Sequence, residues 1–190
     1  MARLRRSRYF VAIAMAGVVL VVLLAWNFSR SDDSGRVQYW DSELPARQSM
    51  SVSAAVTRAS DKLGFPVRVP RDVPTGFTLD VVSAGVGNDD LVRLGIDARA
   101  ATLYFVHENG HALQIDQLPP GGLQPSVAAT PLGPPIAGVE VRLEQPGIRG
   151  VVTITWVASD AAYLARYITA GEEPPDNAPE LLLTVLRSMH

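Results

Sequence analysis

The feature that most limits what this chain can form is a run of twenty uncharged residues, Tyr9 to Phe28. A helix of that length rises about 30 Å, the thickness of the hydrocarbon core of a bilayer. Four arginines precede the run, and Asp32 and Asp33 follow it. Because positively charged flanks stay in the cytoplasm, we expect residues 1–8 to be a cytoplasmic tail and residues 9–28 a single-pass anchor in the cell membrane. The rest of the chain is then extracytoplasmic.

A cleaved signal peptide is the competing interpretation of this run. The apolar core of a signal peptide is shorter, about 7–15 residues, and ends at a small-x-small cleavage site. Here the run ends in Ala25-Trp26-Asn27-Phe28, with bulky residues where small ones are needed. An uncleaved anchor fits the residues better, and both interpretations carry the body of the chain across the membrane.

The part of the chain after this run is mildly acidic. All 19 acidic residues follow Phe28, together with 13 of the 17 basic ones, which leaves a net charge of −6. Nucleic acid needs a basic face, so we expect no nucleic-acid partner. The expected partners are the lipid bilayer, through residues 9–28, and a membrane or envelope protein. The chain has no cysteine, which excludes disulfides and cysteine-ligated zinc.

Turn residues divide the rest of the chain into short strands between two helices. Ser51 to Leu63 follows a helical apolar period and ends at Gly64. Asn177, with Glu180 three residues later, predicts a capping box at the start of a C-terminal helix. The expected strands between them are Phe77–Val86, Leu91–Ile96, Ala101–Val106, Ala112–Leu118, Val139–Glu144, Val151–Val157 and Ala161–Ile168.

This order of elements predicts an α+β fold behind the transmembrane helix. We expect an antiparallel sheet of about six to seven strands, covered by an N-terminal and a C-terminal helix. Residues 29–50 show no sustained period and are expected to form a juxtamembrane linker, and residues 51–190 an extracytoplasmic domain. The proline-rich segment 119–138 is unusually long for a loop in a compact domain, which makes it either functional or disordered.

The sequence His107-Glu108-Asn109-Gly110-His111 has two incompatible interpretations. As H-E-x-x-H it matches the zinc-metallopeptidase signature, in which both histidines ligate zinc and Glu108 is the general base. That chemistry needs a helix and a third ligand, and the remaining histidine is the terminal His190. As the tip of a hairpin, Asn-Gly is the preferred pair for a type I′ turn.

The hairpin is the better interpretation, because glycine costs a helix about 1 kcal/mol relative to alanine and the flanks are rich in strand formers. A two-residue turn pairs His107 with Ala112, so that the two histidines point to opposite faces and cannot share a zinc ion. We therefore expect no metal site, no cofactor and no catalytic residue. His107, His111 and Glu108 are site residues only in the zinc alternative. The same register predicts a shared buried face, formed by Tyr104, Val106, Leu113 and Ile115.

Several segments resemble an uncharacterised bacterial domain family. Gly64–Phe77, with its spaced prolines, is similar to the opening of that family, and Leu113–Gln117, Thr155-Trp156 and the final helix with Leu182 are similar to its later parts. The family looks like the extracytoplasmic, sensor-like C-terminal domain of single-pass anti-sigma-factor-type membrane proteins. The resemblance covers residues 51–190 and carries no catalytic residues.

The expected function is that of a membrane-anchored extracytoplasmic sensor or interaction module without catalytic activity. Anti-sigma proteins carry a cytoplasmic sigma-binding domain, and only eight residues precede this anchor, so a signalling output would come from a partner. The first alternative is a domain that binds a lipid or lipoprotein between a curved sheet and its helices. The second is the zinc metallopeptidase.

Overall fold

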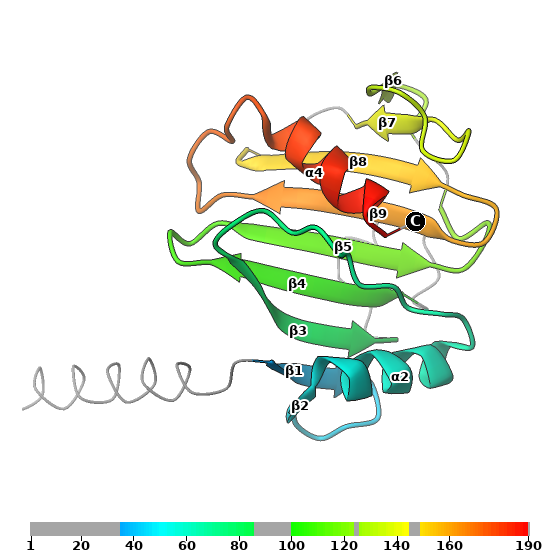
Figure 1. Cartoon of the computed structure of the whole chain (residues 1–190), viewed down its shortest axis with the longest axis vertical. Coiled ribbons are helices and arrows are strands. Elements are labelled where there is room, and N and C mark those ends of the chain that lie inside the picture. The colour runs from blue at the N-terminus through cyan, green and yellow to red at the C-terminus, as the bar shows by residue number, and fades with distance from the viewer. Residues whose placement is uncertain (1–34, 86–99, 124–125, 145–148, 190) are drawn as a thin grey trace, which may run out of the picture. The chain divides into compact units, whose positions relative to one another are not determined.

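The computed structural model describes residues 35–85, 100–123, 126–144 and 149–189. In these residues nine strands form one sheet, accompanied by two helices (Figure 1). The helices are α2 (Val52–Leu63) and α4 (Ala178–Arg187). The strands are β1 (Arg36–Asp41), β2 (Gln48–Ser51), β3 (Phe77–Ala84), β4 (Ala101–His107), β5 (Ala112–Leu118), β6 (Thr130–Pro131), β7 (Val141–Leu143), β8 (Val151–Val157) and β9 (Ala162–Ile168).

The expected antiparallel sheet of six to seven strands is wrong in both number and kind. The strand order is β2-β1-β3-β4-β5-β9-β8-β7-β6, and β1 runs parallel to β3 while the other neighbours are antiparallel. The sheet is therefore mixed. Strand β1 lies inside the expected linker 29–50, and β2 begins in it. Their signal is short: Val37, Tyr39 and Asp41 alternate as buried residues with partly exposed ones, which is the period of a strand with one covered face.

The helices of the described residues do not include the expected transmembrane helix. None of the helices in the described ranges is long and apolar enough to cross a membrane. The predicted anchor at residues 9–28 lies outside the described residues, as does the predicted strand Leu91–Ile96.

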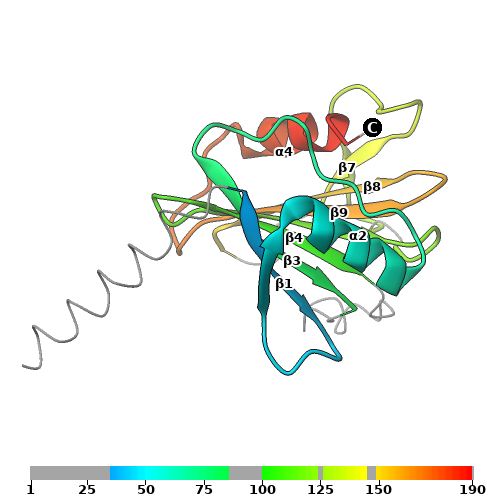
Figure 2. The ribbon, with the colours of Figure 1, turned by 60° about the horizontal axis from the view of Figure 1, so that its bottom comes forward.

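Both helices pack on the same face of the sheet (Figures 1 and 2). Ala55 and Ala59 of α2 and Leu182 and Leu186 of α4 belong to a single buried cluster. The sheet contributes side chains that lie opposite one another on adjacent strands and so share a face, namely Val82, Leu103, Ile115, Ala165 and Ile154. Below, this is the helix face, and the opposite side is the second face.

The ends of the helices test two sequence predictions. The Ser51 hydroxyl accepts a hydrogen bond from the Ala54 N–H (3.3 Å), and Gly64 ends α2 in a left-handed conformation with φ +74°. Glycine adopts that conformation without a Cβ penalty, so the predicted stop is confirmed. The capping box of α4 is wrong, because the side chain of Asn177 makes no capping hydrogen bond.

The chain between α2 and β3 runs across the helix face between the two helices (Figure 1). It is held there by the fully buried side chain of Gln117 on β5. The Gln117 carboxamide accepts a hydrogen bond from the Arg68 N–H (2.8 Å) and donates one to the Arg68 carbonyl (2.6 Å). This pair of hydrogen bonds to the backbone satisfies polar groups that would otherwise be buried without a partner.

The proline-rich segment 119–138 is folded over much of its length. It contains β6, and its Ile136 is buried in the core cluster. The Arg187 side chain of α4 donates a hydrogen bond to the Pro134 carbonyl (3.4 Å). The described part of this segment therefore closes one edge of the core next to α4.

The second face carries a buried polar network at its centre. The Asp116 carboxylate, which is fully buried, accepts hydrogen bonds from the Thr102 hydroxyl (2.6 Å) and from the Gln114 amide (3.0 and 3.1 Å). Arg166, on the neighbouring strand β9, lies 3.5 Å from the same carboxylate. A buried charge is tolerated only when it is paired and hydrogen-bonded in this way.

Candidate functional site

Residues 107–111 form the tip of the β4–β5 hairpin and are called the histidine turn below. The His107 N–H donates to the His111 carbonyl, and the Gly110 N–H donates to the His107 carbonyl, both at 2.9 Å. Three residues therefore connect the strands, and Gly110 has φ +86°. This is the three-residue hairpin in which a glycine with positive φ follows a tight turn. The predicted hairpin is confirmed, but its predicted two-residue turn is wrong.

The additional turn residue changes which side chains share a face. Phe105 lies opposite Leu113, and Leu103 lies opposite Ile115. The predicted grouping of Tyr104 and Val106 with Leu113 and Ile115 is therefore wrong. A shift of one residue moves every side chain of a strand to the other face.

The same shift brings the two histidines together. His107 and His111 lie opposite each other on the helix face, and their ring centroids are 6.5 Å apart. The prediction that they point to opposite faces is wrong. The Phe77 ring of β3 meets the His107 ring edge-on at 4.9 Å, and the Tyr167 ring of β9 meets the His111 ring at 5.6 Å. Three strands and the turn thus contribute to one aromatic cluster.

Asn109 holds both imidazoles at their Nδ1 atoms. Its backbone N–H donates to His107 Nδ1 (3.1 Å). Its Oδ1 accepts from the His111 N–H (3.0 Å), which turns Nδ2 toward His111 Nδ1 at 3.2 Å. The Tyr167 hydroxyl lies 2.7 Å from the same His111 Nδ1. Burial raises the pKa of Tyr167, so its hydroxyl keeps a proton that it can donate.

The surroundings of the two rings differ. His111 Nε2 lies 3.9 Å from a carboxylate oxygen of Glu172, which is an exposed residue after β9. On the other side, His107 Nε2 faces the backbone of Gly76, where a Cβ atom would overlap the ring. Gly76 itself has φ +88°, so both its conformation and its close approach to His107 require glycine.

The zinc alternative needs His107, Glu108 and His111 on one turn of a helix. The structure instead puts them in a hairpin turn with both Nδ1 atoms directed at the donors of Asn109 and Tyr167, and with Glu108 exposed. Within the described residues, no group of three or more histidine, aspartate or glutamate side chains is positioned to hold a metal ion. The chemistry that this arrangement offers is hydrogen bonding and proton uptake by imidazole.

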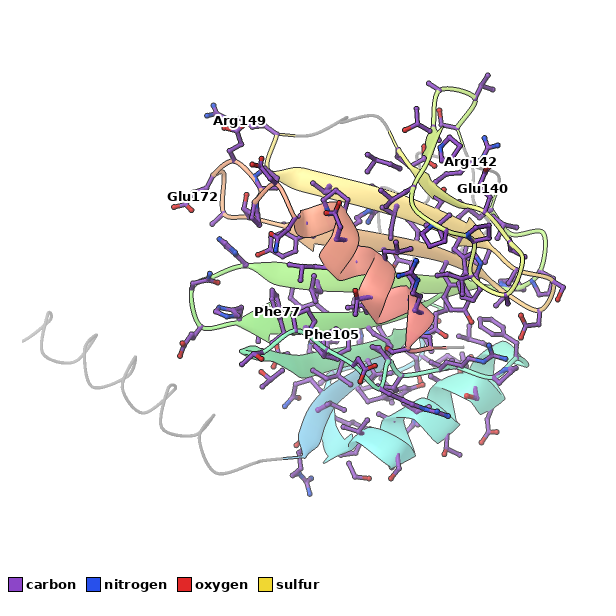
Figure 3. All side chains as sticks on the ribbon, turned by 45° about the horizontal axis from the view of Figure 1, so that its top comes forward. Phe77, Phe105, Glu140, Arg142, Arg149 and Glu172 are labelled. Atoms are coloured by element: carbon purple, nitrogen blue, oxygen red, sulfur yellow. The ribbon has the colours of Figure 1, made fainter. Side chains whose placement is uncertain are left out.

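The histidine turn lies at the end of the sheet where β1 begins (Figure 1). The loop from β9 to α4 and the start of β8 lie at the same end, and Figure 3 shows Arg149 and Glu172 there, with Glu140 and Arg142 toward the opposite end. An open hollow lies beside the aromatic cluster. Val152 in the wall of this hollow is the cross-strand partner of Tyr167. Its lining consists of Arg149, Gly150, Val151, Val152, Glu173, Pro174, Pro175, Asp176 and Pro179.

Comparison with known families gives one match. Residues 4–128 match the family described as "Protein of unknown function (DUF4245)". The chain belongs to this family. The match includes the apolar run at residues 9–28, strands β1 to β5 and the histidine turn. The expected uncharacterised domain family is thereby confirmed, whereas the match does not bear on the anti-sigma-factor resemblance. No curated protein and no solved structure matches the chain.

The sequence pointed to the histidine turn but not to its partners. Tyr167, Glu172 and Phe77 are 30 or more residues away from it in the chain and belong to no motif. The register of β5 with β9 brings Tyr167 opposite Leu113, beside His111. That pairing joins segments separated by residues 119–161. Local hydrophobic periodicity cannot predict which distant strands pair.

Proposed function

We propose that this protein is a membrane-anchored, extracytoplasmic sensor or interaction module without catalytic activity, and that the end of its sheet carrying the histidine turn contacts the partner. The apolar run at residues 9–28, with arginines before it and aspartates after it, supports the anchor. The family match includes that run together with the first half of the sheet.

The observation that carries the proposal is the short tether between the run and the sheet. Only residues 29–35 separate Phe28 from the start of β1, and seven residues span at most about 25 Å. Under this proposal the sheet end at which β1 begins stays within about 25 Å of the bilayer, and the histidine turn lies at that end of the sheet. A partner embedded in the same membrane reaches this end most easily, as the resemblance to anti-sigma-factor-type proteins would require.

Site-specific photo-crosslinking in intact membranes tests the proposal. A photoreactive amino acid replaces Glu108, which is exposed in the histidine turn, or Ser159, which is exposed in the β8–β9 turn at the opposite end of the sheet. We expect the chain in the membrane fraction and a discrete protein adduct from position 108 but not from position 159.

Two outcomes contradict the proposal. One is recovery of the full chain from the soluble fraction. The other is the absence of a protein adduct at position 108. Adducts with lipid alone at both positions would instead support the lipid-binding alternative, which no observation in the described residues favours.

A further inference from the structure

We propose that the histidine turn is a proton-sensitive switch, whose closed form depends on both imidazoles being neutral. The inference deepens the proposed sensor function by naming its stimulus, and it rests on that function only for its biological purpose. The physical argument uses the turn alone.

The bonds of Asn109 fix the protonation state of His107. A backbone N–H can only donate, so His107 Nδ1 must accept in the 3.1 Å bond from Asn109 and cannot carry a proton. The neutral ring then holds its proton on Nε2. A proton on Nδ1 would replace an attractive bond with two donors facing each other.

The protonation state of His111 is constrained in the same way, by the side-chain amide of Asn109. Because Asn109 Oδ1 is occupied by the His111 N–H, the group facing His111 Nδ1 is the amide Nδ2, which only donates. The Tyr167 hydroxyl at 2.7 Å can donate to the same atom. The closed turn thus needs two neutral histidines around one asparagine, and imidazole is the side chain that changes charge near neutral pH.

The charged and titratable groups around the two rings make them unequal. A carboxylate oxygen of Glu172, after β9, lies 3.9 Å from His111 Nε2 and would face a protonated ring. Tyr167 on β9 can turn its hydroxyl to accept from a protonated His111. On the side of β3, His107 meets the neutral residues Gly76 and Phe77, and Glu108 in the turn is exposed. Protonation of His107 is therefore the change that the closed turn compensates least.

Two protonated imidazoles would also repel each other, since their ring centroids are 6.5 Å apart. Loss of the two bonds from Asn109 to the imidazoles leaves the three-residue connection held by its backbone bonds and by the bond from the His111 N–H to Asn109 Oδ1. We expect acidification to open the turn and to expose Tyr167 and the adjoining hollow. The surface presented at the β1 end of the sheet then differs between neutral and mildly acidic conditions.

Hydrogen–deuterium exchange of the full chain in detergent micelles measures the opening. Rates are divided by the intrinsic rates at the same pH, and pH 7.5 is compared with pH 5.5. We expect the protection of the peptide containing residues 107–111 to fall about tenfold at pH 5.5, the effect of losing one ordinary hydrogen bond. The β8–β9 turn, closed by the bond from the Ala158 N–H to the Ala161 carbonyl, contains no histidine and serves as the internal control.

The matched variant replaces both rings by neutral acceptors, in His107→Gln together with His111→Gln. We expect its turn to show no change in protection between the two pH values. An equal change in the variant and the wild type, or no change in the wild type, would overturn the proposal.

A second measurement does not depend on the folding of any variant. Nitrogen-15 NMR of the wild-type imidazoles at pH 7.5 reports which ring nitrogen carries the proton, and we expect Nε2 in both rings. A proton on Nδ1 of either ring contradicts the switch. Neither measurement involves a partner, so failure of the crosslinking experiment and failure of this inference are separate results.

Discussion

Strand β5 buries side chains on both of its faces, but the two faces use different chemistry. On the helix face, Leu113 and Ile115 are fully buried in the apolar core cluster. On the second face, Gln114 and Asp116 are buried in a network with Thr102 and Arg166. Removing an apolar neighbour leaves a cavity but no unpaired charge, whereas removing one partner of a buried ion pair leaves the other charge buried and uncompensated. The second face should therefore be the more specific and the more fragile of the two.

The largest effect is expected from breaking the pair on the second face. In Asp116→Leu the guanidinium of Arg166, only 8% exposed, loses its buried carboxylate. Such a loss typically costs about 3–5 kcal/mol, and urea denaturation of the variant measures it.

The double variant Asp116→Leu with Arg166→Met is the matched control. We expect it to recover most of the lost stability, because the stranded charge is removed together with its partner. Ile115→Ala, one residue away on the helix face, should cost about 2–5 kcal/mol. We expect Arg166→Met to recover none of this loss, because Ile115 is not part of the polar network. Additive losses in the double variant would remove the proposed distinction between the faces.

Gln117 sharpens the comparison, because it is a polar side chain on the helix face. Gln117→Leu keeps the volume but leaves the N–H and the carbonyl of Arg68 without their partners. We expect a loss of about 2 kcal/mol, measured as a shift of the urea midpoint. Gln114→Leu on the second face should cost less, since Asp116 keeps Thr102 and Arg166. The reverse order would show that the crossing segment does not depend on this clamp.

The smallest effect concerns acid stability on the helix face, at the end of β1. Burial alone would raise the pKa of Asp41, but hydrogen bonds from the Glu43 and Leu44 N–H groups and the charge of Lys62 outweigh it, so the pKa is lowered. A lowered folded pKa gives stability that is complete above the unfolded value of about 3.9 and is lost as the pH falls through the folded value.

We therefore expect the free energy of unfolding of Asp41→Asn to fall less than that of the wild type when the pH is lowered from 5 to 3. Urea midpoints at pH 5 and pH 3 give the comparison, with Asp72→Asn, an exposed aspartate, as the control that changes little. Identical acid dependence in Asp41→Asn and the wild type would contradict the assigned role.

The local elements of the fold could be predicted from the sequence, and their pairing only in part. Strand β8 has its predicted bounds, and α2 ends at the predicted Gly64. These signals are local periods and caps. The parallel pairing of β1 with β3 could not be predicted, because it joins two short segments with α2 between them.

The candidate site shows the same limit at the scale of one residue. Asn109-Gly110 correctly indicated a hairpin, but the dipeptide is compatible with both two-residue and three-residue connections. The backbone bond from the His107 N–H to the His111 carbonyl shows the three-residue form, which reverses the predicted relation of the two histidines. The alternation along β5 likewise indicated which residues share a face but not that Asp116 would be buried.

The position of β5 has a consequence for the order in which the sheet is completed. Its first neighbour, β4, is joined to it by the histidine turn, while its second neighbour, β9, begins only after residues 119–161 have been made. During synthesis, the edge of β5 that will pair with β9 is therefore unpaired, next to the apolar side chains of Leu113 and Ile115. Such an edge can pair with another chain, so a nascent or truncated chain ending after β5 would need protection until β9 arrives.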